Sequence, residues 1–164
     1  VCEYTLNERG EEIPFEANEH GDYPETKAGG SDISRIVRVE NVGAQSEYVR
    51  ARLRMTSVVP DGSSADASGN VAFHVNAGEG LPWIDGGDGW YYYRGLVGRG
   101  GMLDPGAMTE SLMDSLRFVG DYHDAARGGS FRLDIDVQAV QAKNQQASDA
   151  VLDVLDVEGW PEAN

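Results

Sequence analysis

The sequence predicts an all-β fold, built as an antiparallel β-sandwich. Two segments, residues 48–55 and 131–139, alternate apolar and polar side chains with the period of two that indicates a strand with one buried face. Turn signals rich in Gly, Pro, Asp and Ser separate short β-branched stretches, and no strand–helix–strand rhythm suggests a parallel sheet. With 164 residues, 40% of them hydrophobic, the chain predicts a single domain over residues 1–164.

The two alternating segments predict two strands, each with one buried face, whose pairing can be tested. In "YVRARLRM", residues 48–55, every second residue from Val49 is apolar, and Tyr48 and the arginines between them are expected to face outward. In "FRLDIDVQAVQA", residues 131–142, Asp134 and Asp136 occupy the corresponding outward positions. If the strands are paired, the arginine row faces the aspartate row, and each cross-strand pair contributes about 0.2 to 1 kcal/mol.

The remaining strands are predicted from β-branched or aromatic residues and from the turns that bound them. "SRIVRVENVG", residues 34–43, predicts a strand that turns into the arginine-rich one. "NVAFHVN", residues 70–76, predicts another strand with His74 on its outward face. Weaker candidates lie around residues 4–6, 12–17, 90–94 and 111–119.

One segment favours a helix instead. Between residues 144 and 160, apolar residues including Val151 and Leu155 recur at helical spacing before a glycine stop. We therefore expect a short C-terminal helix that packs Val151 and Leu155 on the sandwich. "MTESLMDSLRF", residues 108–118, stays open between a strand and a helix capped by Thr109.

The charge of the chain excludes some classes of partner. The 28 acidic and 13 basic residues give a formal charge of −15, whereas nucleic acids and anionic lipid surfaces need a cationic footprint. No apolar run approaches the roughly 18 residues of a membrane span. The chain begins at Val1 without a Met or a signal peptide, and we expect it to be a processed product whose signal has been removed.

Motifs that carry chemistry are sparse. The three histidines, His20, His74 and His123, are far apart in the sequence and lack the spacing of zinc ligands. The Asp-rich loops lack the spacing of a calcium loop, and no nucleophile elbow, phosphate loop or dinucleotide fingerprint is present. The sequence thus predicts no catalytic residue, no cofactor site and no metal site, and a protein that is not an enzyme. Cys2 is left as a free thiol or an intermolecular contact.

The aromatic stretch "DGWYYYRG", residues 88–95, raises the question of a binding surface. On a strand, Tyr91 and Tyr93 share one face, while Trp90 and Tyr92 share the other, so the four rings cannot form one stacking platform. We therefore expect a strand covered on both faces rather than an exposed binding shelf.

The order of motifs around this stretch resembles the TasA and camelysin family of exported proteins, whose signal is removed by a SipW-type peptidase. A Trp and a tyrosine-rich strand are followed by "LDPGAMTESLM", residues 103–113. Upstream, "KAGGSDISRIVRVENVGAQSEYVRARL" resembles the family's Val-x-Val-x-Asn-x-Gly and Tyr-Val-Arg strands, and downstream lie a Val-Gln-Ala strand and Trp160. The resemblance covers about residues 26–160. Ala28-Gly29-Gly30 replaces the family's Pro-Gly, and Arg35 stands where Lys is usual.

The resemblance implies a jelly-roll sandwich that is secreted or held at the cell surface. It implies a structural subunit of the envelope or extracellular matrix, whose partner is a further copy or a related exported subunit. Members polymerise by donating an N-terminal strand, which makes residues 1–30 a mobile or strand-donating segment; an ordinary first strand is the alternative. A sandwich that lacks one strand exposes unpaired backbone that such a segment repairs.

Two other functions stay open. A monomeric surface adhesin or ligand-binding module would use the aromatic rings, and a camelysin-like metalloprotease is less favoured because the sequence offers no zinc site. The candidate interaction residues are Tyr4, Leu6, Ile13, Phe15, Trp83, Trp90 and Tyr92.

Overall fold

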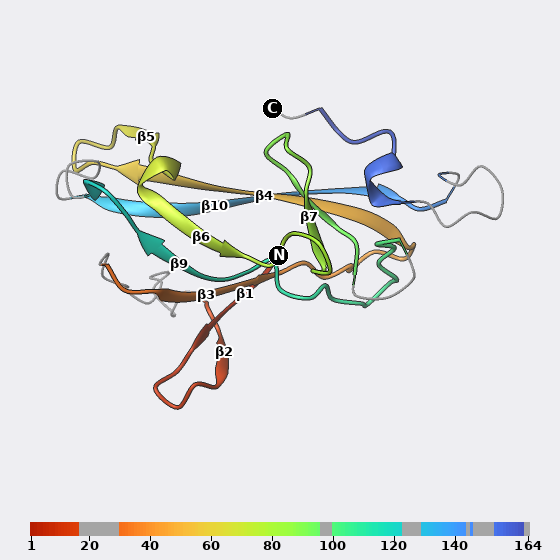
Figure 1. Cartoon of the computed structure of the whole chain (residues 1–164), viewed down its shortest axis with the longest axis horizontal. Coiled ribbons are helices and arrows are strands. Elements are labelled where there is room, and N and C mark those ends of the chain that lie inside the picture. Colours follow the sequence, from red (N-terminus) through yellow and green to blue (C-terminus); the bar gives the residue numbers. More distant parts are fainter. Residues whose placement is uncertain (17–29, 96–99, 123–128, 144, 146–152, 163–164) are drawn as a thin grey trace.

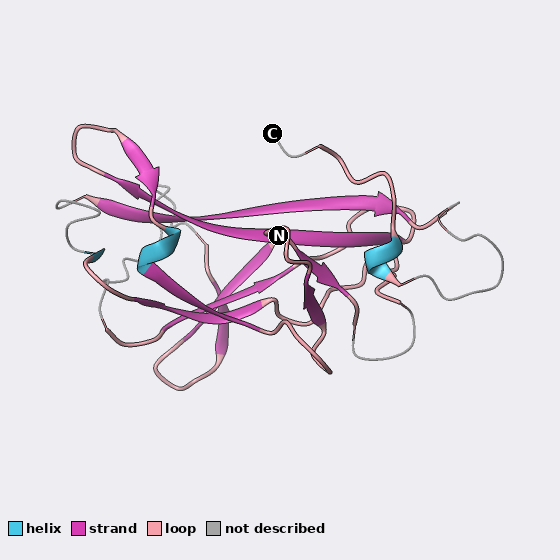
Figure 2. Ribbon diagram, turned by 45° about the horizontal axis from the view of Figure 1, so that its top comes forward, coloured by secondary structure: helices cyan, strands magenta, loops and turns pink. Residues whose placement is uncertain are grey.

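The computed structural model confirms an all-β fold made of two antiparallel sheets (Figure 1). The structure describes residues 1–16, 30–95, 100–122, 129–143, 145 and 153–162. The first sheet has the strand order β2 (Glu12–Pro14), β1 (Cys2–Leu6), β3 (Ile33–Arg38), β9 (Met113–Phe118), β6 (Val71–Val75). The second has the order β10 (Ser130–Gln141), β4 (Glu47–Val58), β8 (Tyr91–Tyr93), β7 (Trp83–Asp85), and β5 (Ser64–Asp66) also pairs with β4. Figure 2 shows strands in both layers, and the helices that it draws in the described part of the chain are short turns.

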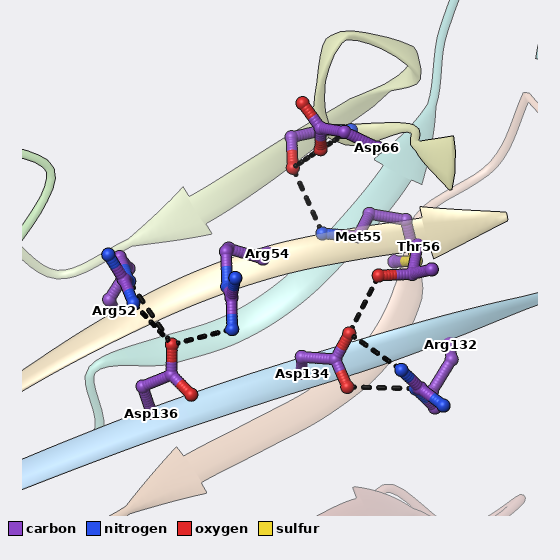
Figure 3. Close-up of polar contacts among 9 residues, drawn as sticks. Arg52, Arg54, Met55, Thr56, Asp66, Arg132, Asp134 and Asp136 are labelled. Carbon is purple, nitrogen blue, oxygen red and sulfur yellow. Dashed lines mark hydrogen bonds and ion pairs between the residues drawn. The ribbon is translucent and has the colours of Figure 1, made fainter. Parts of the chain in front are cut away.

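The longest strand pair, β4 with β10, is the one that the alternating pattern predicts. The two strands pair over twelve residues each, and their register sets Arg54 opposite Asp134 and Arg52 opposite Asp136. Both Arg52 and Arg54 contact the Asp136 carboxylate, each at 2.9 Å, and Thr56 Oγ1 donates to Asp134 at 2.7 Å (Figure 3). The predicted arginine and aspartate rows therefore do face each other.

The main core lies between the two sheets. From β4, the alternating residues that the sequence assigns to the buried face are nearly inaccessible to solvent. They pack against β3 and β9 and against Trp83 at the start of β7. The buried members of this core include Val37, Val49, Ala51, Leu53, Met55, Trp83, Leu112, Met113, Leu116 and Phe118.

The outward face of β4 is only partly exposed, which corrects the sequence-based expectation. Arg54 is exposed as predicted, but Tyr48 and Arg50 are buried, with 1% and 9% of their surfaces accessible. A second cluster covers them, formed by residues near β8 together with Val154 and Val157 of the C-terminal segment. An alternating pattern shows which side chains share a face, but it does not show that a distant segment covers that face.

The prediction that a C-terminal helix packs Leu155 on the sandwich is wrong. The described part of this segment forms the 3₁₀ turn η2 (Val154–Asp156), whose N-cap Asp153 accepts a hydrogen bond from Leu155 N. In a 3₁₀ turn, side chains three residues apart lie on one side, so Val154 and Val157 are buried while Leu155 is 49% exposed. Val151 lies outside the described residues.

The alternative of a helix capped by Thr109 is also wrong, because residues 113–118 form strand β9. Thr109 has a different role: its buried Oγ1 accepts a hydrogen bond from Val39 N at 3.0 Å. His74 lies on the exposed face of β6, as the sequence predicts.

The N-terminal residues form a hairpin of β1 and β2 that extends away from the sandwich (Figure 1). Its turn is stabilised by Asn7, whose carbonyl accepts from Gly10 N and whose Oδ1 accepts from Glu11 N. Gly10 has φ +76°, a conformation that favours glycine. Strand β1 also pairs with β3, with Tyr4 opposite Ile36, so this segment pairs within its own chain in the structure.

Candidate functional site

The candidate interaction residues fall in two places. One group lies on the β1–β2 hairpin at the edge of the first sheet, and the other lies on and beside β7 and β8 of the second sheet. The hairpin group is Tyr4, Leu6, Ile13 and Phe15, and the other group is Trp83, Trp90 and Tyr92.

Two arginines of β3 hold the hairpin. Arg35 forms an ion pair with Glu3 at 2.7 Å, and its guanidinium carbon lies 3.2 Å from the centre of the Phe15 ring. Arg38 binds Glu12 through two hydrogen bonds, of 2.7 and 2.9 Å. The hydrogen bond with Arg38 lowers the pKa of Glu12 below its usual value. Planar guanidinium groups suit these contacts, because a guanidinium can bind one carboxylate through two parallel hydrogen bonds and can also stack on an aromatic ring.

The hairpin leaves apolar side chains in solvent. Leu6 and Ile13 are 46% and 40% exposed, and Val1 is more exposed still. Among the described residues, neither hydrophobic core includes a side chain from residues 1–16. The hairpin is therefore attached by backbone pairing and by arginine contacts, not by burial in the core.

Trp83 belongs to the main core. It has no exposed surface, its ring centre lies 5.2 Å from that of Tyr93, and its Nε1 donates to Glu110 O at 3.1 Å. Burial raises the pKa of Tyr93, and the hydrogen bond from its hydroxyl to Glu110 Oε2 raises it further. In this structure both rings serve packing and present no face to a partner.

The aromatic strand β8 is covered on both faces, which confirms the prediction for this stretch. Tyr93 is buried in the main core and Tyr91 packs against it, whereas Trp90 and Tyr92 are buried in the second cluster. The rings therefore do not form an exposed stacking platform.

Arg50 is the centre of the second cluster. Its guanidinium carbon lies 4.5 Å from the ring centre of Trp90, 4.9 Å from that of Trp160 and 5.7 Å from that of Tyr92. It donates to Tyr92 Oη at 2.9 Å, and two of its nitrogens donate to Gln138 Oε1 at 2.9 and 2.7 Å. These partners accept hydrogen bonds from most of the nitrogens of the buried guanidinium. Sequence reasoning missed this site because its members come from four distant segments.

The Asp-rich loop before β8 completes the cluster. Asp88 accepts hydrogen bonds from Tyr92 Oη at 2.7 Å and from Trp90 N at 3.0 Å. Burial by itself would raise the pKa of Asp88, but these hydrogen bonds outweigh it and the pKa is lowered. A Cβ atom on Gly86 would lie 2.4 Å from Tyr92 Cε2, so only glycine lets the loop approach this ring.

The described residues hold no group of three His, Cys, Asp or Glu side chains that could bind a metal ion. His74 instead lies 3.3 Å from Asp32, which also accepts from Arg117 at 2.8 Å. Cys2 is half-buried, with Sγ 3.7 Å from Glu40 Oε2. His20 and His123 lie outside the described residues. Within the described part of the chain, no helix is long and apolar enough to cross a membrane.

The fold defines the class of the protein as a two-sheet antiparallel β-sandwich, with a hairpin at one sheet edge and a covered aromatic face on the other sheet. Comparison with known proteins finds no matching family model, no matching curated protein and no matching solved structure.

Proposed function

We propose that this chain is an exported structural subunit of the cell envelope or extracellular matrix, which assembles with further copies by donating its N-terminal hairpin. The resemblance to the TasA and camelysin family supports export and the jelly-roll arrangement of the strands. The observation that carries the proposal is the attachment of the hairpin: β1 pairs with β3, yet residues 1–16 add no side chain to either described core.

This attachment suits an exchange between copies. If the hairpin leaves its own subunit, the edge of β3 is open, and the same hairpin from a neighbour restores every contact that was lost. These contacts include the β1–β3 register, the Glu3–Arg35 and Glu12–Arg38 pairs, and the hydrogen bonds of Thr5 and Leu6 with Ser34. The exchange of an identical element therefore changes the free energy little at equilibrium. If the exchange does not close into a dimer or ring, it continues from copy to copy and produces a fibre.

The structural role is better supported than the alternatives. A ligand-binding module or adhesin built on the aromatic rings would need them exposed, but Trp83 is in the main core and Trp90 and Tyr92 are covered by the C-terminal segment. Nothing observed in the described residues favours a camelysin-like protease.

The first test compares the full chain with a version that lacks residues 1–17, by size-exclusion chromatography and negative-stain microscopy. We expect polymers from the full chain only, and a folded protein that forms no polymers from the shortened chain, because the core is independent of the hairpin. Monomers from both chains at high concentration would contradict the proposal.

A charge exchange tests donation directly. Glu12→Arg and Arg38→Glu each place like charges where the hairpin meets β3, so we expect neither variant to polymerise alone. A mixture of the two should polymerise, because the hairpin of the first variant then matches the β3 strand of the second. Glu8→Arg, in the exposed turn of the hairpin, makes the same charge change and should polymerise alone. A mixture that stays monomeric while the unmodified chain polymerises would show that the hairpin is not exchanged.

A further inference from the structure

The C-terminal segment, residues 153–162, lies on the outer face of the second sheet. Figures 1 and 2 both place η2 beside the end of the β4–β10 pair. The backbone hydrogen bonds of Asp156 and Val157 close short turns with Asp153 and Val154, within the segment itself. Among the described residues, its contacts with the sheet are made by side chains and by one hydrogen bond to its backbone, from Arg50 Nη2 to Pro161 O at 3.4 Å. Gln145, which follows β10, also donates from Nε2 to Glu158 O at 2.9 Å and accepts from Glu158 N at 3.2 Å.

Three apolar side chains anchor the segment, and they are three residues apart. Val154 is completely buried and Val157 is 5% exposed. Trp160 packs edge-on to Tyr92, with ring centres 5.7 Å apart at 80°. The 3₁₀ turn explains why Val154 and Val157 lie on the same side, and it leaves Leu155 in solvent. The three anchoring residues therefore follow the sequence pattern Val-x-x-Val-x-x-Trp.

The sheet offers a matching surface, formed by Tyr48, Arg50, Trp90, Tyr92 and Val140. We name it the Arg50 face. Its guanidinium carbon lies 4.5 Å from the ring centre of Trp90, just before β8, and 4.9 Å from that of Trp160 in the segment. A cation that contacts two aromatic rings is stabilised by both, so Arg50 favours a Trp at this position of the segment.

We propose that the Arg50 face is a peptide-binding site for the Val-x-x-Val-x-x-Trp segment, and that it binds the C-terminal segment of a second copy as well as its own. Among the described residues, the anchoring contacts join the segment to the Arg50 face and to Gln145, and all of these partners lie outside the stretch 146–152 that links them to the segment. In one chain the link keeps the effective concentration high, so the site is filled in cis at low protein concentration, and exchange between copies becomes significant as concentration rises. The Arg50 face lies on the second sheet and binds a C-terminal segment, whereas the hairpin of the proposed function is N-terminal and pairs with the first sheet.

The test cleaves the chain between β10 and the C-terminal segment without removing any residue of either part. A protease site introduced between residues 146 and 152 of the full chain is cleaved after folding, and native mass spectrometry measures whether the released segment stays bound. A fluorescent peptide of residues 153–164 is then added in excess, and anisotropy reports its uptake. We expect the segment to stay bound at micromolar concentration and the labelled peptide to replace it.

One protein variant and two peptide variants separate specific binding from nonspecific association. Arg50→Lys keeps the charge but loses the planar group, and should weaken peptide binding on the order of tenfold. Val154→Ala in the peptide should weaken it by a similar factor, whereas Leu155→Ala, at the exposed position of the same turn, should leave it unchanged.

Three results would overturn the proposal. They are loss of the segment on cleavage, a retained segment that the labelled peptide never replaces, and equal effects of the two alanine peptides. The outcome is independent of hairpin donation, because a chain without residues 1–17 should exchange its C-terminal segment equally well. Sedimentation of the uncleaved shortened chain should then show a dimer at high concentration that Arg50→Lys diminishes.

Discussion

Replacing Trp83 by Ala should destabilise the whole fold. The ring has no exposed surface, packs on Tyr93 and donates a hydrogen bond to Glu110 O. A buried Trp removes about 150 to 250 Å² from water, which at about 25 cal/mol per Å² corresponds to about 4 to 6 kcal/mol. Because extended-chain areas are upper bounds, we expect a loss of about 4 kcal/mol, within the usual range for Trp to Ala. In a domain of this size, that loss lowers Tm by about 8 to 16 °C.

Urea unfolding followed by circular dichroism measures this loss. Trp83→Phe keeps an aromatic ring but removes the hydrogen-bond donor, and should cost about 1 to 2 kcal/mol. Leu81→Ala, two residues away and 41% exposed, should change stability by less than about 0.5 kcal/mol. A Trp83→Ala protein that loses less than about 1 kcal/mol would refute the core assignment and would return Trp83 to the candidates for surface recognition.

Three further outcomes are expected. A double-mutant cycle on Arg52 and Asp136, measured by urea unfolding, should give a coupling of about 0.2 to 1 kcal/mol, and zero coupling would contradict the β4–β10 register. Gly101→Ala should cost more than about 2 kcal/mol in thermal unfolding, because Gly101 has φ +90° and its Cβ would lie 2.0 Å from Tyr93 O; a neutral result would contradict this close approach. The folded-state pKa of Glu12 lies below its usual 4.5, so its contribution is complete above about that pH and is lost as the pH falls through the folded value. Hydrogen-exchange protection of the hairpin should therefore decrease once the pH is low enough to protonate Glu12, and protection that is the same before and after this protonation would contradict the role of the Glu12–Arg38 pair.

The sequence by itself determined the alternation of the two longest strands of the second sheet, but not the short strands β5 and β7. Residues 48–55 and 131–139 alternate without a break, and a shift of one residue would move the whole apolar row of either strand to the wrong face. This local pattern predicts that an arginine row meets an aspartate row if the two strands pair, whereas the pairing itself and the register that sets Arg52 opposite Asp136 come from the structure. The same period of two divides the rings of residues 90–93 between two faces, as the structure has them.

The pattern could not decide what covers each face. Arg50 and Arg54 have equivalent positions in the alternation, yet Arg50 is buried and Arg54 is exposed, because a segment more than a hundred residues later reaches only one of them. In the same way, helical spacing favoured Leu155 as an anchor, whereas the 3₁₀ turn buries Val154. Periodicity is a property of a few neighbouring residues, but burial depends on contacts between segments that only the tertiary structure brings together.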